Sequence, residues 1–519
     1  MKQLVLFSFI LCSISINAQK TWSSDVAQIF YTKCATCHHP SGIGGFSLQK
    51  YSEVSPMANA ISDAISTDKM PPWPPSKKYQ KYTHDRSLND TEKQTVLDWI
   101  KNNVPEGNPA QTPLLPVFPE GAMLAGGDLT VRIPKYMSKA SIGKDDYVCF
   151  SVPTGITEKR SIKAIEIVPG NRKIVHHALI FVDQTASETT DSTSGKCSSP
   201  GNPSTVLIAG YTPGATPVTF PNKEPLKLGI TMEAGAKIYF TMHYPDGSYG
   251  EFDSTKVIFH FYPKDETAIR EVSAAAVIQN WNFSLPPNKK TAVSASYKAL
   301  PSDISLLSVF PHMHLLGESI KAYGISPKND TIKFIDVPKW DFHWQDFFFF
   351  KNIVFAPKGT VIKGEGIYDN TSDNPNNPNN PPITVVPGLN TANEMFLVYF
   401  HYMIHQAGDE NYDMESLITA SLNEALTIDK SILKVFPNPL KDKCQIILPS
   451  KIGELYNVVI YDIQGKSIKN LIKNQQSNSK EISLIWDGTN DNGEEVRKGI
   501  YFVSVNLGGT FSTARIIKE

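Results

Sequence analysis

The middle of the chain limits the possible folds most strongly, because its apolar residues come in short alternating segments. Lys237 to Met242, Val257 to Tyr262 and Phe396 to Met403 are examples, and Pro, Gly and Asn turns separate such segments. Alternation with a period of two buries one face of a β-strand. We therefore expect two all-β domains, jelly rolls or sandwiches, at residues 126–265 and 266–425.

Near the N-terminus the sequence Cys34-Ala35-Thr36-Cys37-His38 has the spacing of a haem-attachment motif. Two thiols three positions apart can add to the two vinyl groups of a haem, and the next histidine then ligates the iron. Chance spacing or a zinc knuckle are the alternatives. A zinc site would call for further ligands, and no second cysteine pair lies nearby in the sequence.

The residues around this motif predict a small helical domain at residues 19–108. Ser23 to Tyr31 has the pattern of an amphipathic helix, and Asp90 to Asn102 predicts a closing helix with Asp90 as its cap. The segment resembles a class I cytochrome c, which implies one covalently bound c-type haem held by Cys34, Cys37 and His38.

Such cytochromes usually place a methionine on the far side of the iron. Met70 is the best candidate, since the prolines that follow it stiffen its loop. Met57 and His84 are the alternatives. Residues 109–125 are rich in proline and poor in charge, which is typical of a linker.

A second set of histidines lies in the β-rich region: His176-His177, His243, and His312 with His314. Imidazole is a common ligand for zinc, copper and iron. On a strand, His312 and His314 would share one face. His176 and His177 would point to opposite faces, so both could bind one metal only at a bulge or a strand end.

Taken singly, these residues also have structural interpretations. A His-x-His pair is usually an ordinary part of a strand, His243 could cap a turn, and Met395 could be core packing. Four further histidines have no partner pattern, and we expect them to be structural or on the surface. They are His260, His343, His401 and His405.

The order His-His, His, His-x-His and Met resembles the copper type II, ascorbate-dependent monooxygenases, the family of the peptidylglycine α-hydroxylating and dopamine β-monooxygenases. The resemblance implies an electron-transfer copper bound by His176, His177 and His243. It implies an oxygen-activating copper bound by the remaining three ligands. They are His312, His314 and Met395.

The resemblance also bears on the substrate pocket. Tyr399 falls where the family has a pocket tyrosine. Phe310 stands in place of an arginine that binds a substrate carboxylate, and Leu397 in place of a pocket asparagine. An apolar or aromatic small molecule is therefore a better expected substrate than a peptide with a free carboxylate.

Cysteine content fits an oxidising compartment. Cys149 and Cys197 could form a disulfide, and the resemblance places one at these positions in the first β-domain. Cys444 has no evident partner, and we expect it to be a small buried apolar residue. The chain has 50 Lys and Arg against 51 Asp and Glu, which argues against binding to nucleic acid or to an anionic membrane surface.

Both ends of the chain carry export signals. Residues 1–18 have a basic start at Lys2, an apolar stretch and a small-residue cleavage site, which predicts a signal peptide. No later segment approaches about 18 consecutive apolar residues, so we expect no membrane span. Residues 431–519 predict a small Ig-like β-sandwich.

This tail resembles the sorting domains of the type IX secretion system, which implies that its machinery is a partner and that the protein reaches the cell surface. An Ig-like adhesion module is the alternative interpretation. We expect a secreted haem- and copper-dependent monooxygenase. An external donor would reduce the haem, the haem would feed two copper ions, and O2 would hydroxylate a C–H bond. A non-catalytic electron-transfer or copper-binding surface protein is the alternative, and an adhesin with relic metal sites is a third possibility.

Overall fold

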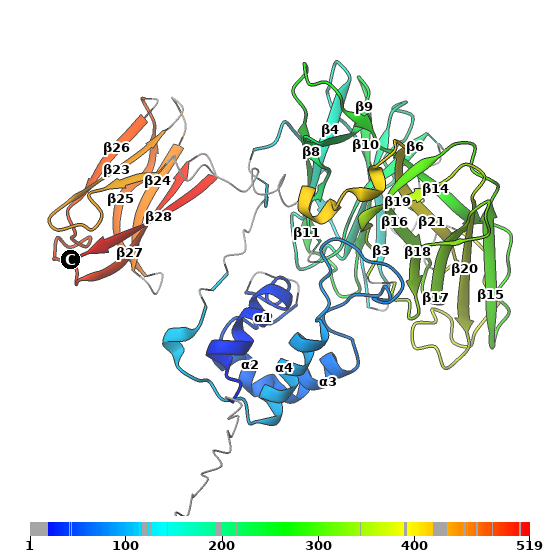
Figure 1. Ribbon diagram of the computed structural model, residues 1–519, viewed down its shortest axis with the longest axis horizontal. Helices are drawn as coiled ribbons and strands as arrows, with labels where there is room; N and C mark the ends of the chain where they lie inside the picture. Colours follow the sequence, from blue (N-terminus) through cyan, green and yellow to red (C-terminus); the bar gives the residue numbers. More distant parts are fainter. Residues whose placement is uncertain are drawn as a thin grey trace, which may run out of the picture. The chain divides into compact units, whose positions relative to one another are not determined.

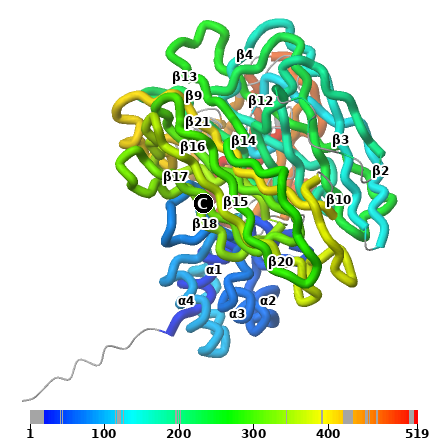
Figure 2. Tube along the Cα trace, turned by 90° about the vertical axis from the view of Figure 1, so that its right-hand side faces the viewer, coloured from blue at the N-terminus to red at the C-terminus, as the bar shows by residue number. Residues whose placement is uncertain are grey.

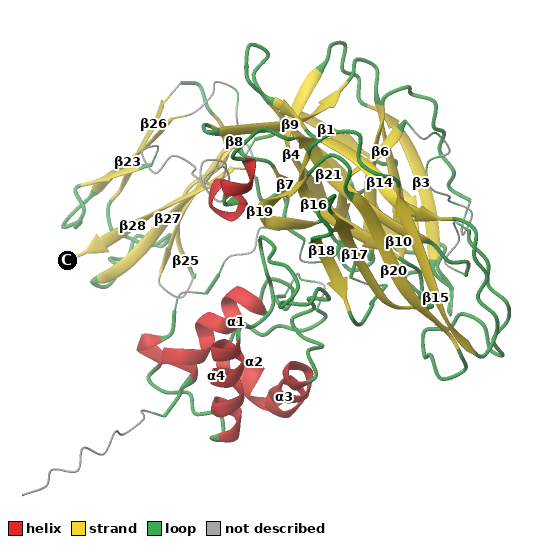
Figure 3. Cartoon of the chain, turned by 45° about the vertical axis from the view of Figure 1, so that its right-hand side comes forward, coloured by secondary structure: helices red, strands yellow, loops and turns green. Residues whose placement is uncertain are grey.

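A computed structural model shows a chain built mostly of β-sheets, with a few helices near the N-terminus (Figures 1 and 3). The predicted signal peptide and His343 lie outside the described residues. The structure describes residues 19–40, 42, 44–113, 115–116, 122–124, 126–142, 144–193, 197, 200, 202, 204–213, 215–342, 344–388, 392–418, 433–449, 453, 455–462, 466–479, 481–507 and 510–519.

The chain divides into two compact units. The first takes the described residues up to Ala122 and those from Asp128 to Ile418, so the helical segment and the β-rich middle belong to one unit. The second takes Met123–Gly127 and the described residues beyond 418. No helix in the described ranges is long and apolar enough to cross a membrane.

The helical segment packs around aromatic rings. Trp22, Phe30 and Trp99 are at most 2% exposed, and their ring centroids lie 5.3–6.4 Å apart. The N-cap of α4 is Asn89, so the prediction of Asp90 as cap was wrong by one residue. The Asn89 side chain accepts from Glu92 N, and Glu92 bonds back to Asn89 N. The helices are η1 (Trp22–Val26), α1 (Ala27–Lys33), α2 (Tyr51–Val54), η2 (Ser55–Met57), α3 (Ala58–Ser66), α4 (Asp90–Lys101) and η3 (Pro109–Gln111).

The first β-region contains a seven-stranded sheet with the path β1-β12-β4-β9-β13, to which β7 and β8 add, a four-stranded sheet β3-β10-β5-β6 and a small pair β11-β2. The disulfide predicted between Cys149 and Cys197 is present and ties β3 to the segment before β6. The strands are β1 (Leu129–Arg132), β2 (Tyr136–Met137), β3 (Asp146–Pro153), β4 (Arg160–Val168), β5 (His177–Asp183), β6 (Thr205–Tyr211), β7 (Val218–Thr219), β8 (Asn222–Lys223), β9 (Leu226–Met232), β10 (Lys237–Tyr244), β11 (Phe252–Asp253), β12 (Lys256–Phe261) and β13 (Arg270–Glu271).

The second β-region has two four-stranded sheets, β14-β21-β16-β19 and β15-β20-β17-β18, whose buried side chains form one core. Strand β21 pairs with both β14 and β16 although it is the last strand of this region in sequence. Figure 2 shows the long strands of the region running together. The strands are β14 (Ser273–Asn280), β15 (Lys289–Tyr297), β16 (Ile304–His312), β17 (Gly317–Ile325), β18 (Thr331–Val337), β19 (Phe348–Ala356), β20 (Val361–Asn370) and β21 (Phe396–Ile404). The short helix η4 (Asp409–Asn411) follows.

A segment of the helical part extends over the second β-region. Between α3 and α4, Tyr82 forms a β-bridge with Phe350 of β19, and its hydroxyl donates to Phe334 O at 2.7 Å. Tyr82 is 6% exposed and belongs to the core of these sheets. We call residues 76–86 the docking segment.

The second unit is a sandwich of a three-stranded sheet β22-β23-β26 and a four-stranded sheet β25-β24-β27-β28, with one core between them. Cys444 is 1% exposed in that core, which confirms its prediction as a buried apolar residue. The strands are β22 (Lys434–Phe436), β23 (Cys444–Pro449), β24 (Leu455–Asp462), β25 (Ser467–Gln476), β26 (Glu481–Trp486), β27 (Gly499–Leu507) and β28 (Thr510–Lys518).

Candidate metal centres

His176, His177 and His243 come together at one end of the sheet β3-β10-β5-β6. His177 is the first residue of β5, and it lies opposite His243 of β10. His176 stands just before the strand, and its N–H donates to His243 O at 3.0 Å. His176 and His177 therefore lie at a strand end. A strand end and a bulge were the two places predicted to let both rings bind one metal.

The three rings turn the same nitrogen toward a common point. The Nδ1–Nδ1 distances are 3.4 Å between His176 and His177, 3.2 Å between His176 and His243, and 3.1 Å between His243 and His177. A point equidistant from such atoms lies about 1.9 Å from each, near the roughly 2.0 Å of a metal–imidazole bond. The set fits a metal ion with three nitrogen ligands.

Neighbouring groups fix which nitrogen of His243 is available. Its Nε2 lies 2.9 Å from Asp145 Oδ2, so Nε2–H donates to the carboxylate and Nδ1 keeps its lone pair. Tyr147 stacks on the same ring, with centroids 4.2 Å apart and planes within 8°. Asp145 lies immediately before β3, and its role was not predicted from the sequence.

His312 and His314 form the second pair, with ring centroids 5.1 Å apart. The two rings meet as expected, but not on one strand, because β16 ends at His312 and His314 lies beyond it. His314 is held instead by a turn: its N–H donates to Glu394 Oε2 at 2.8 Å. Hydrogen bonding to the neighbouring segment thus brings the rings together.

Hydrogen bonds also select the free nitrogen in this pair. His312 Nδ1 lies 2.6 Å from Gln345 Oε1, and His314 Nδ1 lies 3.0 Å from Asn393 O. Both Nδ1 atoms therefore act as donors, which leaves both Nε2 atoms with lone pairs. Desolvation lowers the pKa of His312 to about 4, so its ring is neutral at pH 7 and able to bind a metal.

The backbone of Met395 is linked to that of His314 by the side chain of Glu394. Met395 directly precedes β21 and is 3% exposed, and its carbonyl accepts from Tyr368 Oη at 2.7 Å. The buried Glu394 accepts from the N–H groups of His314, Leu316 and Met395 at 2.6–3.3 Å. Burial raises the pKa of Glu394 to about 8, although these donors favour its ionised form. The Glu394 carboxyl group thus clamps the two segments together, a role not predicted from the sequence.

Three apolar or aromatic residues lie close to His312 on the paired strands β16 and β21. They are Phe310, Leu397 and Tyr399. Phe310 lies opposite Tyr399 in the register of β16 and β21, and His312 lies opposite Leu397. The Phe310 ring is nearly parallel to His312, 6.3 Å away, and meets Tyr399 edge-on at 6.2 Å. Burial raises the pKa of Tyr399 to about 12. The two positions that depart from the resembled family therefore form an apolar wall beside His312.

Of the four histidines expected to be structural or on the surface, the three that the structure describes lie outside these clusters. His401 is buried against Phe347, with its Nδ1 2.8 Å from Ser308 Oγ. His405 Nδ1 lies 2.9 Å from Ser305 Oγ, and His260 is a buried residue of β12. Of the described histidine, cysteine and acidic residues, only His176, His177 and His243 gather three ligand atoms within 4.8 Å of one another.

The motif with Cys34, Cys37 and His38 follows α1. Both thiols are free, and burial raises the pKa of Cys34 to about 12. His38 Nδ1 is buried without a hydrogen-bond partner among the described residues. A Cβ on Gly44 would come within 2.2 Å of that nitrogen, so only glycine allows the chain to pass this close.

Met70 is 40% exposed and lines a cavity of about 870 Å³ together with Trp73, Trp340 and Trp344. Cys34, Cys37 and His38 are not among the described residues that line it. Ile65 and Leu88 do line it, and both belong to the helical core against which Cys34 packs. The cavity therefore borders the core against which Cys34 packs.

Comparison with known proteins identifies two segments. Residues 275–424 match the copper type II ascorbate-dependent monooxygenase, C-terminal domain. Residues 434–519 match the secretion system C-terminal sorting domain. Dopamine beta-hydroxylase of Canis lupus familiaris is 24% identical over 255 residues, which cover 46% of this chain and 39% of that protein.

Two solved structures from Porphyromonas gingivalis are also similar. PorZ, a bacterial surface component of the type IX secretion system, is 17% identical with a TM-score of 0.14, over 24% of this chain and 15% of its own. Latent PorU is 11% identical with a TM-score of 0.15, over 70% of this chain and 34% of its own. The chain thus carries a copper monooxygenase-like domain and a type IX sorting domain, which indicates export to the cell surface or beyond.

Proposed function

We propose that this chain is an exported monooxygenase that binds two copper ions and hydroxylates a C–H bond of an apolar or aromatic small molecule. Such a reaction combines O2 with two electrons and two protons, inserts one oxygen atom into the substrate and releases the other as water. The observation that carries the proposal is the convergence of three Nδ1 atoms, from His176, His177 and His243, within 3.1–3.4 Å.

In the proposal, each cluster presents a defined ligand set. The first offers three Nδ1 atoms, with Asp145 keeping the proton on His243 Nε2. The second offers Nε2 of His312 and of His314, and Met395 adds a thioether. Copper held there would supply one-electron transfer at the first cluster and activation of O2 at the second, where a soft sulfur ligand favours Cu(I).

The wall beside His312 supports the proposed substrate class. Phe310 and Leu397 are 1% and 3% exposed, and Tyr399 lies next to them across the strand pair. These side chains are apolar or aromatic and provide no cation for a carboxylate, which favours an apolar or aromatic substrate over a carboxylate. The Tyr399 hydroxyl would orient a substrate atom while remaining protonated, since burial raises its pKa to about 12.

We further propose that a covalent haem on Cys34 and Cys37 receives electrons from an external donor and passes them toward the first cluster. The cavity beside the helical core supports it. Met70 is favoured as second ligand because it lines that cavity. Met57 packs against the helical core, and His84 pairs with Glu415 at 3.6 Å.

Metal content and O2 consumption test the enzyme. The loaded protein should hold two copper ions and consume O2 only with substrate, in a screen of apolar and aromatic compounds. His314→Ala should abolish that consumption, and the outlying variant His405→Ala should keep it. Substrate-dependent uptake that survives in His314→Ala would contradict the proposal.

The haem is tested separately by the visible absorption of denatured protein, in which only covalent haem stays on the chain. Cys34→Ser with Cys37→Ser should abolish this absorption, and Cys444→Ser should not. Met70→Leu should change the spectrum and lower the reduction potential, whereas Met57→Leu should leave both unchanged. If the wild-type chain is produced in cells that attach haem and still carries no covalent haem, the haem proposal is refuted and the copper proposal is not affected.

A non-catalytic copper or electron-transfer protein is the second candidate. The burial of Phe310, at a position where the resembled family has a substrate-binding arginine, favours it. Such a protein would hold two copper ions and exchange electrons, but would give no hydroxylated product with any compound of the screen. An adhesin would bind no copper.

A further inference from the structure

The loop between β18 and β19, described over residues 338–342 and 344–347, packs against the second histidine pair. Trp340 Nε1 donates to His314 O at 3.2 Å, and Trp340 N donates to Glu318 O at 2.7 Å. Gly317 lets the indole approach, because a Cβ there would lie 2.6 Å from it. The loop is therefore held on the segment that follows His314.

Phe342, at the centre of this loop, contacts both clusters. Its ring centroid lies 5.8 Å from that of His177 and 6.2 Å from that of His243. The same ring lies 5.8 Å from His314, edge-on at 81°. Phe342 is 6% exposed, so these contacts are shielded from water. One aromatic side chain thus packs on imidazoles of both proposed copper sites.

Gln345 extends the contact to His312. Its Oε1 accepts from His312 Nδ1, and its Nε2 donates to Phe342 O at 2.8 Å. Phe342 and Gln345 together therefore reach four of the five clustered histidines. A displacement of this loop would alter the orientation of rings in both clusters.

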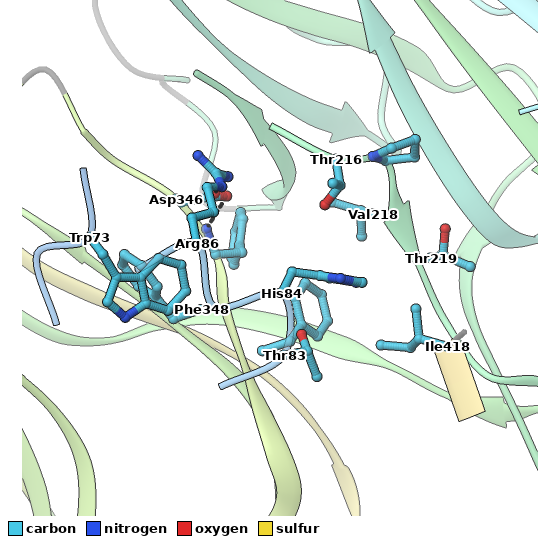
Figure 4. Close-up of a pocket in the computed structure, with 13 residues that line it drawn as sticks. Trp73, Thr83, His84, Arg86, Thr216, Val218, Thr219, Asp346, Phe348 and Ile418 are labelled. Carbon is cyan, nitrogen blue, oxygen red and sulfur yellow. Dashed lines mark hydrogen bonds and ion pairs between the residues drawn. The ribbon is translucent and has the colours of Figure 1, made fainter. Parts of the chain in front are cut away.

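The end of the loop is fixed from the helical part of the chain. Arg86 Nη2 lies 2.7 Å from Asp346 Oδ2, an ion pair drawn in Figure 4. Phe347 and Phe348, the next residues, line a cavity of about 30 Å³ with Trp73 and Thr83 of the helical part. The Arg86–Asp346 ion pair therefore ties the end of the loop to the helical part.

We propose that Phe342 is a positioning residue shared by both histidine clusters, so that metal bound at one cluster raises the metal affinity of the other. The inference rests on the proposed function, since both clusters must bind copper. A metal at the first cluster fixes the planes of His177 and His243. The ring packed on them is then fixed as well, and His314 is ordered before its own metal arrives. Such coupling is reciprocal.

A double-mutant cycle tests the coupling. Copper affinity at the second cluster is measured from the Cu(II) paramagnetic resonance signal that disappears in His312→Ala. We expect His243→Ala to weaken this affinity at least about fivefold, the lower end of usual coupling between sites. Phe342→Leu should weaken it similarly, and the double variant should be no weaker than either single variant. The inference would be overturned if the fold-losses in copper affinity of the two single variants multiplied in the double variant, or if Phe342→Leu left the affinity unchanged.

Two further variants control for packing. Phe355→Leu removes a ring that stacks on His405, 4.1 Å away and outside both clusters, and should leave the affinity unchanged. Phe342→Tyr keeps the ring and should keep the coupling. If Phe342→Leu unfolds the protein, the other variants test the inference. Retained coupling in Phe342→Tyr, together with weakened copper binding in His243→Ala, would support it. Loss of coupling in Phe342→Tyr would count against it.

A copper-free measurement separates this inference from the proposed function. In protein with isotope-labelled histidine, Phe342→Leu should shift the imidazole resonances of His177 and His314, and Phe355→Leu should shift His405 alone. A wild-type chain that binds no copper refutes the proposed function, while the resonances still test the contact. Two bound copper ions with unshifted resonances refute the role of Phe342 alone.

Discussion

At the scale of single residues, hydrogen bonds to the imidazoles decide which nitrogen can hold a metal. Asp145 occupies Nε2 of His243, whereas Gln345 and Asn393 O occupy Nδ1 of His312 and His314. A ring with one nitrogen committed as a donor presents the other as a ligand without a tautomer change. His243 therefore presents Nδ1, whereas His312 and His314 present Nε2, and groups outside the proposed ligand sets select these nitrogens.

Asp145→Asn should weaken copper binding at the first cluster by about 10–100-fold, the usual cost of losing such a partner. The amide carries no charge to stabilise the donating Nε2–H of His243. Titration with a competing chelator measures the effect. The exposed Asp265→Asn is the control, and equal affinity in Asp145→Asn and wild type would exclude the role of Asp145.

A buried ion pair joins the two β-regions at another point. Arg270, in β13, forms two hydrogen bonds of 2.6 and 2.8 Å with Asp409 of η4, which is 2% exposed. Burial would raise the pKa of Asp409, but hydrogen bonds from Arg270, Gln406 N and Ser305 hold the pKa below its usual value. The ionised carboxylate is thus part of the folded structure.

Asp409→Asn should therefore lower the free energy of unfolding by about 3 kcal/mol at pH 7, since it leaves Arg270 without a counter-charge. A carboxyl with a lowered folded pKa stabilises above its unfolded pKa, and this contribution is lost as pH falls through the folded pKa. Urea unfolding should show a constant difference from wild type between about pH 7 and 5, shrinking below about pH 4. The exposed neighbour Glu410→Gln should show no such difference, and a gap that widens in acid would contradict the assignment.

At the scale of elements, the docking segment fixes the helical part against β19 and β18. Thr83 N donates to Phe349 O at 2.8 Å, and Ser76 N donates to Asp336 O at 2.8 Å. Together with the Tyr82–Phe350 bridge, these bonds cover the edges of two sheets, since β19 and β18 are edge strands of different sheets. A segment that pairs with an edge strand satisfies backbone groups that would otherwise face solvent.

Tyr82→Phe should destabilise the first unit by about 1 kcal/mol, because the carbonyl of Phe334 loses its donor, and Tyr82→Ala by about 3–5 kcal/mol, because a cavity forms. Urea unfolding measures both. Tyr79→Phe is the matched control, since the Tyr79 hydroxyl is buried without a partner in the described structure. If Tyr79→Phe cost as much as Tyr82→Phe, the hydroxyl of Tyr82 would not be the source of the effect.

At the scale of the whole molecule, the chain consists of two units with separate cores. The sorting unit has Trp486 at 0% exposure, with its indole N–H donating to Thr489 O at 2.9 Å. The histidine clusters and their surrounding contacts all belong to the other unit. We therefore expect the two units to unfold as separate cooperative steps.

Trp486→Ala should remove about 3–5 kcal/mol from the sorting unit alone. Calorimetry should show one of two transitions shifted to lower temperature, and copper binding by the other unit should be unchanged. Ile485→Ala, at a neighbouring side chain that is 60% exposed, should shift neither transition. A shift of both transitions by Trp486→Ala would show that the units unfold together.

The sequence by itself determined the features that depend on local period and spacing. Alternating segments predicted the strands, the adjacency of His176 and His177 required a bulge or a strand end, and Cys149 was paired with Cys197, all as the structure has them. The turn that carries His314 was missed because β16 ends two residues earlier. A strand end depends on competing hydrogen bonds, here to Glu394, which is far away in sequence.

Only the tertiary structure decided which groups surround the candidate ligands. Asp145, Gln345 and Glu394 carry no motif, and a charged residue directly before the apolar run that starts at Met395 was the one available signal. Phe342 contacts both His177 and His314, although Phe342 and His177 are 165 positions apart. The strands of the two β-regions bring these distant segments together. A sequence pattern records distances along the chain, whereas these contacts depend on the pairing and packing of whole sheets, which no local pattern specifies.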